Sequence, residues 1–249
     1  MGSTSESGHA VNISSMKELI SAITGLGAAY DPSNELISKP NLEKSLVNSK
    51  NQHTAFMQVD SINKGLITDR AASFDILETR VTQIMGEVRS SRMPQQSKDT
   101  ASGLADKIRG KRASAILTDE EKKALEAKGK SSKQISASQQ SFNNRISNFT
   151  KLVTFLETIK EYTPKNKVLT IAGLKEYLNE LNTANDKVIN YTDTYKTAMD
   201  KRDAVMYAEE TGMTDLALTV KEFVKTLGGV KDPRYKNINS IKFKNLKGK

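Results

Sequence analysis

The chain has 249 residues, of which 38 are Lys or Arg and 29 are Asp or Glu, so its formal net charge is +9. This length accommodates one large domain or two of ordinary size, each able to bury a core without a metal or disulfide. The absence of Cys excludes disulfides and thiolate chemistry. A hydrophobic fraction of 37% and a mean hydropathy of −0.53 favour long helices with polar faces over a thick α/β core.

The N-terminal segment gives no sign of a targeting sequence. Its first twelve residues, MGSTSESGHAVN, have neither the basic nor the apolar part of a signal peptide. No apolar run in the chain approaches the roughly 20 residues of a membrane-spanning helix. We therefore expect a soluble, cytoplasmic protein in which residues 1–13 form a disordered leader.

The first predicted helix begins near residue 14 and ends near residue 30. Its apolar positions are spaced by 3, 4 and 3 residues, which places them on one helical face: they are Ile20, Ile23, Gly27 and Tyr30. The same spacing recurs in the second half of the chain, at Leu152, Phe155, Ile159 and Tyr162.

Each of these helices is followed by the same motif, Tyr-x-Pro-x-Asn, at 30–34 and at 162–166. Proline disfavours the helical conformation of the residue before it, so both helices must end near the tyrosine. The asparagine suits the turn that follows, and Ser38 and Thr170 stand where the next helix needs an N-cap. The motif therefore predicts a helix–turn–helix hinge that the chain contains twice.

A long helix is predicted after each hinge. Seam positions in a 4–3 rhythm run from Leu42 to Phe74 and from Leu174 to Met206. The first of these helices has a neighbouring stripe, formed by Val59, Ile62 and Leu66. Long stripes with polar interruptions are typical of helical bundles with coiled-coil-like packing.

A third helix is predicted in each half. It would contain Val81, Ile84, Met85 and Val88 in the first half, and Met213, Leu216, Val220, Phe223 and Val224 in the second. Between the halves we expect a loop at 93–103, a short helix after Thr118, and one continuous helix from about 132 to 162. The only candidate strand is SIKFKNL at 240–246.

The two halves align without a gap when segment 15–92 is placed on segment 147–224. The helical signals coincide, which indicates a tandem duplication. We therefore predict an all-α fold of two tandem, internally duplicated antiparallel helical bundles with long central helices. The expected segments are a leader (1–13), a first bundle (14–97), a basic connector (98–133), a second bundle (134–230) and a basic tail (231–249).

The positive charge is concentrated outside the predicted bundles. Residues 1–97 and 134–230 carry net charges of −1 and 0, whereas 98–133 and 231–249 carry +4 and +6. Both basic segments follow a third helix, and KIRGKR (107–112) matches SIKFKN (240–245) when one extra residue is allowed. They are candidate sites for a polyanion such as nucleic acid. The candidate residues are Lys107, Arg109, Lys111, Arg112, Arg234, Lys236, Lys242, Lys244 and Lys247.

Two interpretations of the basic tail stay open. In one, Tyr235 and Phe243 stack on nucleic-acid bases beside the lysines. In the other, the tail only improves solubility, or the apolar edge of Ile238, Ile241 and Phe243 packs back on the bundle with the lysines outward. No recognised nucleic-acid-binding motif accompanies the basic residues.

One charged pair also occurs twice, as Arg70 with Glu78 and as Arg202 with Glu210. Each arginine lies near the end of a long helix and each glutamate lies just past the expected bend. Because a guanidinium can bind a carboxylate through two hydrogen bonds, we predict a partly buried salt bridge that clamps this turn in each bundle. The alternative is that the arginines bind an anion.

Neither a catalytic site nor a metal site is indicated. The only histidines are His9, in the expected leader, and His53, on a long helix, where packing is a commoner role than catalysis. No His and carboxylate cluster has metal-ligand spacing, and no Ser or Thr has a plausible histidine partner. GLGAAY (25–30) and DSINKG (60–65) resemble nucleotide and calcium loops only weakly, because both lie in helical patterns. We therefore expect no cofactor.

Four segments carry a resemblance to known sequences: ISSMKELISAITGLGAAYDPSNELIS, NRISNFTKLVTFLETIKEYTPKNKVLTIAGLKEYLNEL, TGMTDLALTVKEFVKTLGG and YKNINSIKF. Together they are similar to a set of duplicated helical proteins of Bacteroidota, over nearly the whole chain. Those are hypothetical proteins without an assigned activity. The resemblance therefore implies a duplicated fold and a bacterial, non-secreted protein, and it brings no catalytic residues.

The leading hypothesis is a non-catalytic helical interaction or scaffold protein that binds a protein partner or a second copy of itself. The alternative is a nucleic-acid-associated protein that binds phosphates through the basic connector and tail. An enzyme would need a site of carboxylates that folding gathers inside a bundle, because the usual nucleophile and acid–base constellations are missing.

Overall fold

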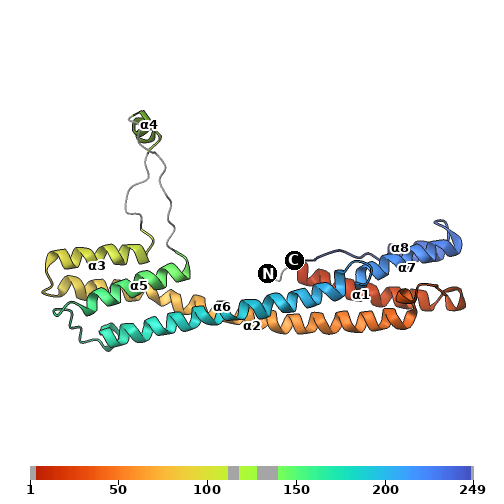
Figure 1. The fold of residues 1–249 in the computed structure, drawn as a ribbon, viewed down its shortest axis with the longest axis horizontal. Helices are drawn as coiled ribbons and strands as arrows, with labels where there is room; N and C mark the ends of the chain where they lie inside the picture. Colours follow the sequence, from red (N-terminus) through yellow and green to blue (C-terminus); the bar gives the residue numbers. More distant parts are fainter. Residues whose placement is uncertain (1–3, 112–117, 128–139, 248–249) are drawn as a thin grey trace. The chain divides into compact units, whose positions relative to one another are not determined.

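The structure, a computed structural model, describes residues 4–111, 118–127 and 140–247. Every regular element in these residues is an α-helix or a short 3-10 helix (Figure 1). The described residues contain no strand, and the candidate strand at 240–246 is not one. The all-α prediction is therefore confirmed.

The chain folds into two compact units, which we call unit 1 (Met1–Lys64 and Asn190–Lys249) and unit 2 (Gly65–Ile189). Unit 1 contains α1 (Thr4–Thr24), η1 (Gly27–Ala29), η2 (Glu35–Ile37), the first part of α2 (Lys39–Ser90), the last part of α6 (Ile171–Tyr207), α7 (Met213–Gly228) and α8 (Pro233–Ser240). Unit 2 contains the rest of α2 and α6, together with α3 (Gln95–Ile108), α4 (Asp119–Ala127), α5 (Phe142–Glu157) and η3 (Lys167–Leu169).

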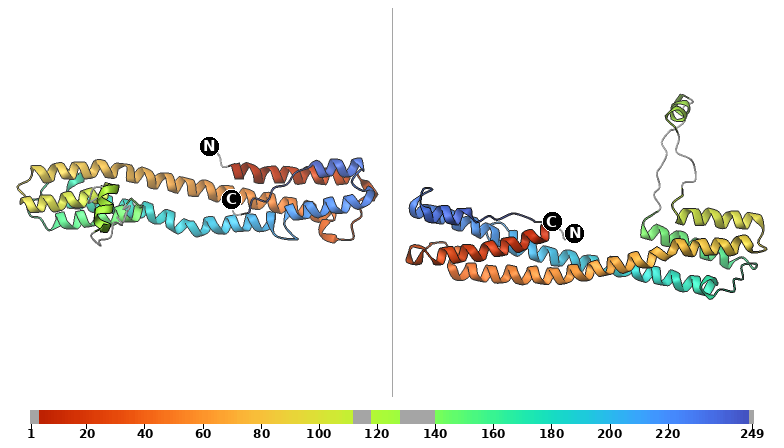
Figure 2. Two further views of the ribbon diagram at one scale, coloured as in Figure 1. Left: turned by 90° about the horizontal axis from the view of Figure 1, so that it is seen from above. Right: turned by 180° about the vertical axis from the view of Figure 1, so that it is seen from behind.

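These units differ from the predicted bundles 14–97 and 134–230. Each unit combines the beginning of one predicted bundle with the end of the other. The reason is that the separate third helix predicted around Val81–Val88 is wrong: these residues continue α2, which is unbroken from Lys39 to Ser90. Figures 1 and 2 show the result in unit 1, where α1 (red) lies beside α7 and α8 (blue), although they come from opposite ends of the chain.

The second long helix, in contrast, ends at Tyr207, and a tight turn separates it from α7. Within this turn Glu210 has a φ of 63°. A Cβ on Gly212 would lie 2.4 Å from the backbone nitrogen of Ala208, so only glycine fits there without a shift of the backbone. In the alignment of the two halves, Gly212 corresponds to Arg80, and α2 continues through Arg80 as a helix.

The repeated motif forms the same hinge in both places. The Tyr30 hydroxyl donates a hydrogen bond to the carbonyl of Ile37 at 2.6 Å, and the Tyr162 hydroxyl donates to the carbonyl of Leu169 at 2.9 Å. The asparagine side chain of each motif accepts a hydrogen bond from the backbone nitrogen two residues later, which caps η2 and η3. The predicted hinge is therefore confirmed in both halves.

Unit 1 has one hydrophobic core, to which both ends of the chain contribute. One face of α1 buries four residues at spacings of 3, 1 and 3: Met16, Leu19, Ile20 and Ile23. The C-terminal half completes the core with Met206, Tyr207, Met213, Leu216, Ala217, Val220, Val224, Ile238 and Ile241. Because fully burying one such apolar side chain is worth about 1.5–3 kcal/mol, neither end can be removed without exposing the other.

Unit 2 repeats this arrangement with the halves exchanged. One face of α5 buries residues at the same spacings of 3, 1 and 3: Phe149, Leu152, Val153 and Leu156. The N-terminal half completes this core with Phe74, Leu77, Val81, Ile84, Met85, Val88, Met93, Ala101, Ala105 and Ile108.

Three segment predictions need correction. Residues 4–13 of the expected disordered leader lie in α1, where His9 and Asn12 are buried. Residues 95–103 of the expected loop belong to α3, whose apolar side packs into the core of unit 2. The helix expected from about 132 begins at Phe142 in the described residues, because Ser141 caps it by accepting a hydrogen bond from the backbone nitrogen of Asn144 at 3.2 Å.

Candidate interaction surfaces

The basic tail packs back onto unit 1. Ile238 and Ile241 are buried, and Phe243 packs partly buried against the same core. Two hydrogen bonds join the tail to α1: Asn12 Nδ2 donates to the carbonyl of Lys244 at 2.7 Å, and the backbone nitrogen of Lys244 donates to Asn12 Oδ1 at 3.0 Å. The interpretation in which an apolar edge of the tail packs back on the bundle is therefore confirmed.

A buried lysine lies underneath this tail. The Nζ of Lys221 donates to the carbonyl of Ile241 and lies 5.5 Å from the ring centroid of Phe243. Burial lowers the pKa of Lys221, and the nearby charge of Lys242 lowers it further. Tyr235 also packs partly buried against the core, as Phe243 does, which leaves less of each ring for the predicted stacking on bases.

The five candidate cations of the tail are all exposed and differ in their partners. Four of them are Lys236, Lys242, Lys244 and Lys247. The fifth, Arg234, pairs with Asp232 at 2.7 Å, and its hydrogen bonds hold the pKa of that carboxyl below its usual value. Asp232 is also the N-cap of α8, so Arg234 supports a helix start, whereas the four lysines face solvent.

The connector places its cations beside a carboxylate. Lys111 and Arg109 lie 3.0 and 3.9 Å from Asp106, and the Arg109 guanidinium donates to the Thr82 hydroxyl at 3.0 Å. Lys107 is exposed. The remaining candidate, Arg112, lies outside the described residues. Local pairing therefore offsets part of the positive charge predicted for this segment.

The predicted clamp between Arg202 and Glu210 is wrong. Arg202 is fully buried, and its Nε and Nη2 lie 2.9 and 2.7 Å from Oδ1 of Asp203. Its guanidinium carbon lies 4.2 Å from the ring centroid of Phe56 on α2. Glu210 is exposed in the turn after α6, where its backbone nitrogen donates to Asp215. The arginine therefore joins α6 to α2 inside unit 1.

Arg70, the other predicted clamp arginine, also has different neighbours. Its guanidinium carbon lies 4.0 Å from the ring centroid of Phe142, and its Nη1 donates to Asn185 Oδ1 at 3.4 Å. Glu78 is exposed two turns further along the same helix. The clamp fails here because α2 does not contain the bend that would bring Arg70 and Glu78 together.

Two more arginines of unit 2 stack on aromatic rings. The Arg80 guanidinium lies 5.3 Å from the ring centroid of Tyr177 and donates to the carbonyl of Val168 at 2.8 Å. The Arg145 guanidinium lies 5.4 Å from the ring centroid of Phe74. Burial raises the pKa of Tyr177 to about 12, although both arginines act to lower it. These contacts hold α2 against α5 and α6.

The two histidines meet inside unit 1. Their ring centroids are 5.9 Å apart, and His9 Nδ1 lies 2.5 Å from the hydroxyl of Tyr207. Asn12 Nδ2 donates to the same hydroxyl at 3.2 Å. His53 is packed, as its place on a helical seam predicted. Among the described residues, no group of three His, Cys, Asp or Glu side chains could hold a metal ion.

Each of the two long helices has side chains in a regular pattern along one face. On α2, side chains at steps of 3 and 4 form what we call the α2 stripe: Gln52, Ala55, Val59, Ile62, Leu66, Asp69 and Ser73. On α6, the same steps give the α6 stripe: Glu180, Thr183, Lys187, Asn190, Thr194, Thr197 and Lys201. Such spacing presents one continuous face of each helix.

Each unit has a shallow groove between the two stripes. The groove of unit 1 has a volume of about 400 Å³, with Ala55 and Val59 on one side and Lys201 on the other. The groove of unit 2 has a volume of about 270 Å³, with Leu66 and Asp69 lining its α2 side. In both grooves apolar and polar side chains of α2 face a mostly polar side of α6, which includes Lys201 in unit 1 and Lys187 in unit 2.

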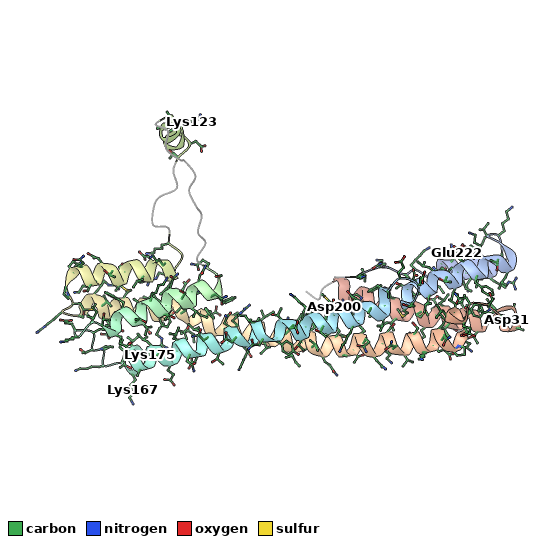
Figure 3. All side chains as sticks on the ribbon, viewed as in Figure 1. Asp31, Lys123, Lys167, Lys175, Asp200 and Glu222 are labelled. Atoms are coloured by element: carbon green, nitrogen blue, oxygen red, sulfur yellow. The ribbon has the colours of Figure 1, made fainter. Side chains whose placement is uncertain are left out.

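The long helices bury no side chain along much of this surface. No residue is buried from Met57 to Ser73 in α2 or from Ile189 to Lys201 in α6. Figure 3 locates Asp200 on this part of α6, with Lys175 near the start of the helix. Within the α2 stripe, Ile62 is 53% accessible. Met57 and Ile189, which are 53% and 50% accessible, lie outside the two stripes. An exposed apolar row with polar edges is typical of an interaction site.

Part of this exposed surface could be recognised from the sequence. Val59, Ile62 and Leu66 were visible as a stripe beside the predicted seam. The periodicity shows that these residues share a face, but it cannot show whether another element of the chain covers that face. Among the described residues, no helix combines the length and the apolar character that crossing a bilayer requires.

Comparison with protein-family models, with curated proteins and with solved structures gave no match for this chain.

Proposed function

We propose that this protein is a non-catalytic helical scaffold that assembles with a second copy of itself through the α2 stripe. The observation that carries the proposal is the uncovered stretch of α2 from Met57 to Ser73, in which Ile62 is half exposed and no side chain is buried. Helices in proteins gain most of their stability from the packing of one apolar face. Covering this face therefore stabilises the long helices.

A second copy fits this surface by symmetry. In a dimer with a two-fold axis near Ile62, Val59 of one copy lies close to the partner's Leu66, because these positions are three and four residues from Ile62. The pairing is isologous, so one apolar row serves both copies. Each square ångström of apolar surface removed from water contributes about 25 cal/mol.

Charge also favours self-association at this surface. From Met57 to Ser73, α2 carries two acidic and two basic residues: Asp60, Lys64, Asp69 and Arg70. A balanced surface can meet a copy of itself without net repulsion, whereas the excess of +9 lies mainly in the connector and tail.

We infer that the long helices run antiparallel, as a scaffold of paired helices requires. In unit 1 the Ser49 hydroxyl donates to the carbonyl of Val205, and further along α2 the rings of Phe56 and Tyr195 lie 5.5 Å apart. The residue number thus rises on α2 while it falls on α6. The tandem duplication remains our interpretation of the repeated hinge and of the matching buried faces of α1 and α5.

The test is to measure the mass of the full-length protein by light scattering over a range of micromolar concentrations. We expect a concentration-dependent dimer. Ile62→Glu should weaken the dimer at least tenfold, because it places a charge at the centre of the apolar row; a tenfold change corresponds to about 1.4 kcal/mol.

Met57→Glu is the matched control. Met57 lies on the same helix with the same 53% exposure, but it is outside the α2 stripe, on a different face. It should leave the dimer unchanged. A monomeric wild-type protein at every concentration, or equal effects of the two substitutions, would refute the proposal.

The alternative function, binding of nucleic acid, is favoured by one observation. The tail is held against α1 by hydrogen bonds to Asn12, while four of its lysines stay exposed. A fixed row of cations loses less entropy on binding phosphates than a flexible one. Its test is the salt dependence of binding to random duplex DNA.

A further inference from the structure

The two units are built from equivalent parts that come from opposite halves of the chain. In unit 1 the buried face of α1 belongs to the same core as Val220 of α7. In unit 2 the buried face of α5 belongs to the same core as Val88, which is the counterpart of Val220 in the alignment of the two halves. Ile108 and Ile241, which occupy matching places in the two basic segments, are each buried in one of the two cores.

We propose that the two halves of the chain, residues 4–111 and 140–247, are mutual binding partners that hold together without the peptide link between them. The surface formed by α1, η2 and the start of α2 takes α7 and α8. The equivalent surface formed by α5, η3 and the start of α6 takes the end of α2 and α3. Each half therefore binds a second helical segment of the same ancestry.

Neither half can complete its own core. In the N-terminal half, Leu42 lies in the core that contains α1, while Val88 lies in the core that contains α5. Both residues belong to one unbroken helix, near its opposite ends. Because an α-helix rises about 1.5 Å per residue, Val88 cannot fold back onto the face of α1 while α2 stays helical. In a tandem bundle, Val88 would pack on α1. Val220 of the C-terminal half therefore occupies that place instead.

The hinge contributes to the fit. Tyr30, at the first hinge, meets Phe223 of α7 edge to face, with their ring centroids 5.3 Å apart. The hinge therefore presents an aromatic ring to the partner half as well as ending a helix. Such aromatic pairs contribute beyond the area that they bury.

The experiment uses the full-length protein with a protease site inserted between Lys130 and Ser131, in the Ile62→Glu background so that the proposed dimer does not interfere. After cleavage we expect both fragments to elute together as a 1:1 complex and to separate only at denaturant concentrations that abolish the helical signal. Separate elution under native conditions, or precipitation of either fragment after cleavage, overturns the proposal.

A second measurement identifies which surfaces are joined. Because the chain has no Cys, pairs of cysteines can be introduced cleanly and joined with a short thiol crosslinker. Tyr30→Cys with Phe223→Cys should link the two fragments of the cleaved protein at least tenfold more efficiently than Tyr30→Cys links to Ser91→Cys within one fragment. Ser91 is the counterpart of Phe223 in the alignment of the two halves, so preferential linking of the Ser91 pair would show tandem bundles and overturn the exchange.

This proposal stands apart from the proposed self-association. A wild-type protein that stays monomeric would refute the dimer and leave the association of the two halves intact. Fragments that part after cleavage would refute the association of the halves and leave the dimer to be judged on its own test.

Discussion

The fully buried Arg202 offers the sharpest test of the packing in unit 1. Its guanidinium contacts the carboxylate of Asp203 through Nε and Nη2 and covers the ring of Phe56. Arg202 is 0% exposed and Asp203 is 4% exposed. Arg202→Met keeps much of the apolar volume but removes the positive charge beside a buried carboxylate. We expect this substitution to destabilise unit 1 strongly.

The magnitude follows from the burial of both groups. Removing one partner of a buried ion pair costs about 3–5 kcal/mol, because the remaining charge stays in a poorly solvated place. The lost stacking on Phe56 contributes up to about 2 kcal/mol and is partly contained in that figure. With a typical total stability of about 5–15 kcal/mol, the loss is a large fraction of the whole. The double variant Arg202→Met with Asp203→Leu should recover most of it, since neither charge of this pair then remains buried.

Urea unfolding followed by circular dichroism measures these differences. Arg70→Met is the comparison, because Arg70 is only partly buried and donates to an amide instead of a carboxylate. We expect it to cost about 1–2 kcal/mol. If Arg202→Met changed the free energy of unfolding by less than about 1 kcal/mol, or if the double variant were no better than the single one, the reasoning about the buried charge would be wrong.

Three further outcomes are expected. Burial raises the pKa of Tyr162 to about 12; the unfolded chain loses this proton near pH 10, so stability should fall as the pH rises from about 10 to about 12. Tyr162→Phe should remove about 1.4 kcal/mol per pH unit from that slope, and equal slopes in urea titrations would contradict it. Gly212→Ala should destabilise by about 1–3 kcal/mol because its Cβ meets backbone, whereas Gly65→Ala, in open space on α2, should stabilise by about 0.5–1 kcal/mol; calorimetry showing the same sign for both would refute this. If the tail binds DNA, changing four of its exposed lysines to Gln should reduce the slope of log affinity against log salt by about 3–4, and a wild-type protein that does not bind at low salt would eliminate that function. These four are Lys236, Lys242, Lys244 and Lys247.

The features that sequence alone predicted well are those set by neighbouring residues. The hinges were predictable because a proline, an asparagine and a tyrosine act within a short stretch of chain. The helical class was predictable because apolar spacing of 3 and 4 persists over long stretches. The all-α prediction and both hinges therefore depend on short-range physics, which a single sequence contains.

The separate third helix of the first half was predicted wrongly because a bend that occurs in the second half was assigned to both halves. The bend after Tyr207 depends on Gly212 and on the positive φ of Glu210. The alignment assigned the same bend to the first half, where Arg80 stands in place of the glycine and α2 runs on. The Arg70–Glu78 clamp failed with it, since it needed that bend to turn Glu78 back toward Arg70. The Arg202–Glu210 clamp failed although the bend is present, because Arg202 pairs with Asp203 and Glu210 is exposed.

The alignment is also displaced by one position at the first helix of each half. Matching the buried faces of α1 and α5 places Met16 on Phe149, whereas the ungapped alignment of 15–92 with 147–224 places Met16 on Asn148. Such a slip is tolerated because each face contains two adjacent buried residues, so that Ile20 meets a buried counterpart, Leu152 or Val153, in either alignment.

The long-range pairing could not be predicted in this way. A helical stripe shows which side of a helix is buried, but not which other helix buries it. Asn12 and Tyr207, which meet in unit 1, come from opposite halves of the chain and carry no pattern that links them. The candidate interaction surface is ambiguous for the same reason. The apolar spacing along a stripe is the same whether or not another helix covers it.

Because α1 is covered by α7 and α8, the segments that bury it are synthesised long after α1 itself. The core of unit 2 reaches only to Leu181, whereas that of unit 1 extends to Ile241. At about 5–20 residues per second, the ribosome needs about 3–12 s to add the intervening stretch. Throughout that interval the apolar side of α1 lacks its final neighbours. A chaperone bound to the nascent chain can shield it from water.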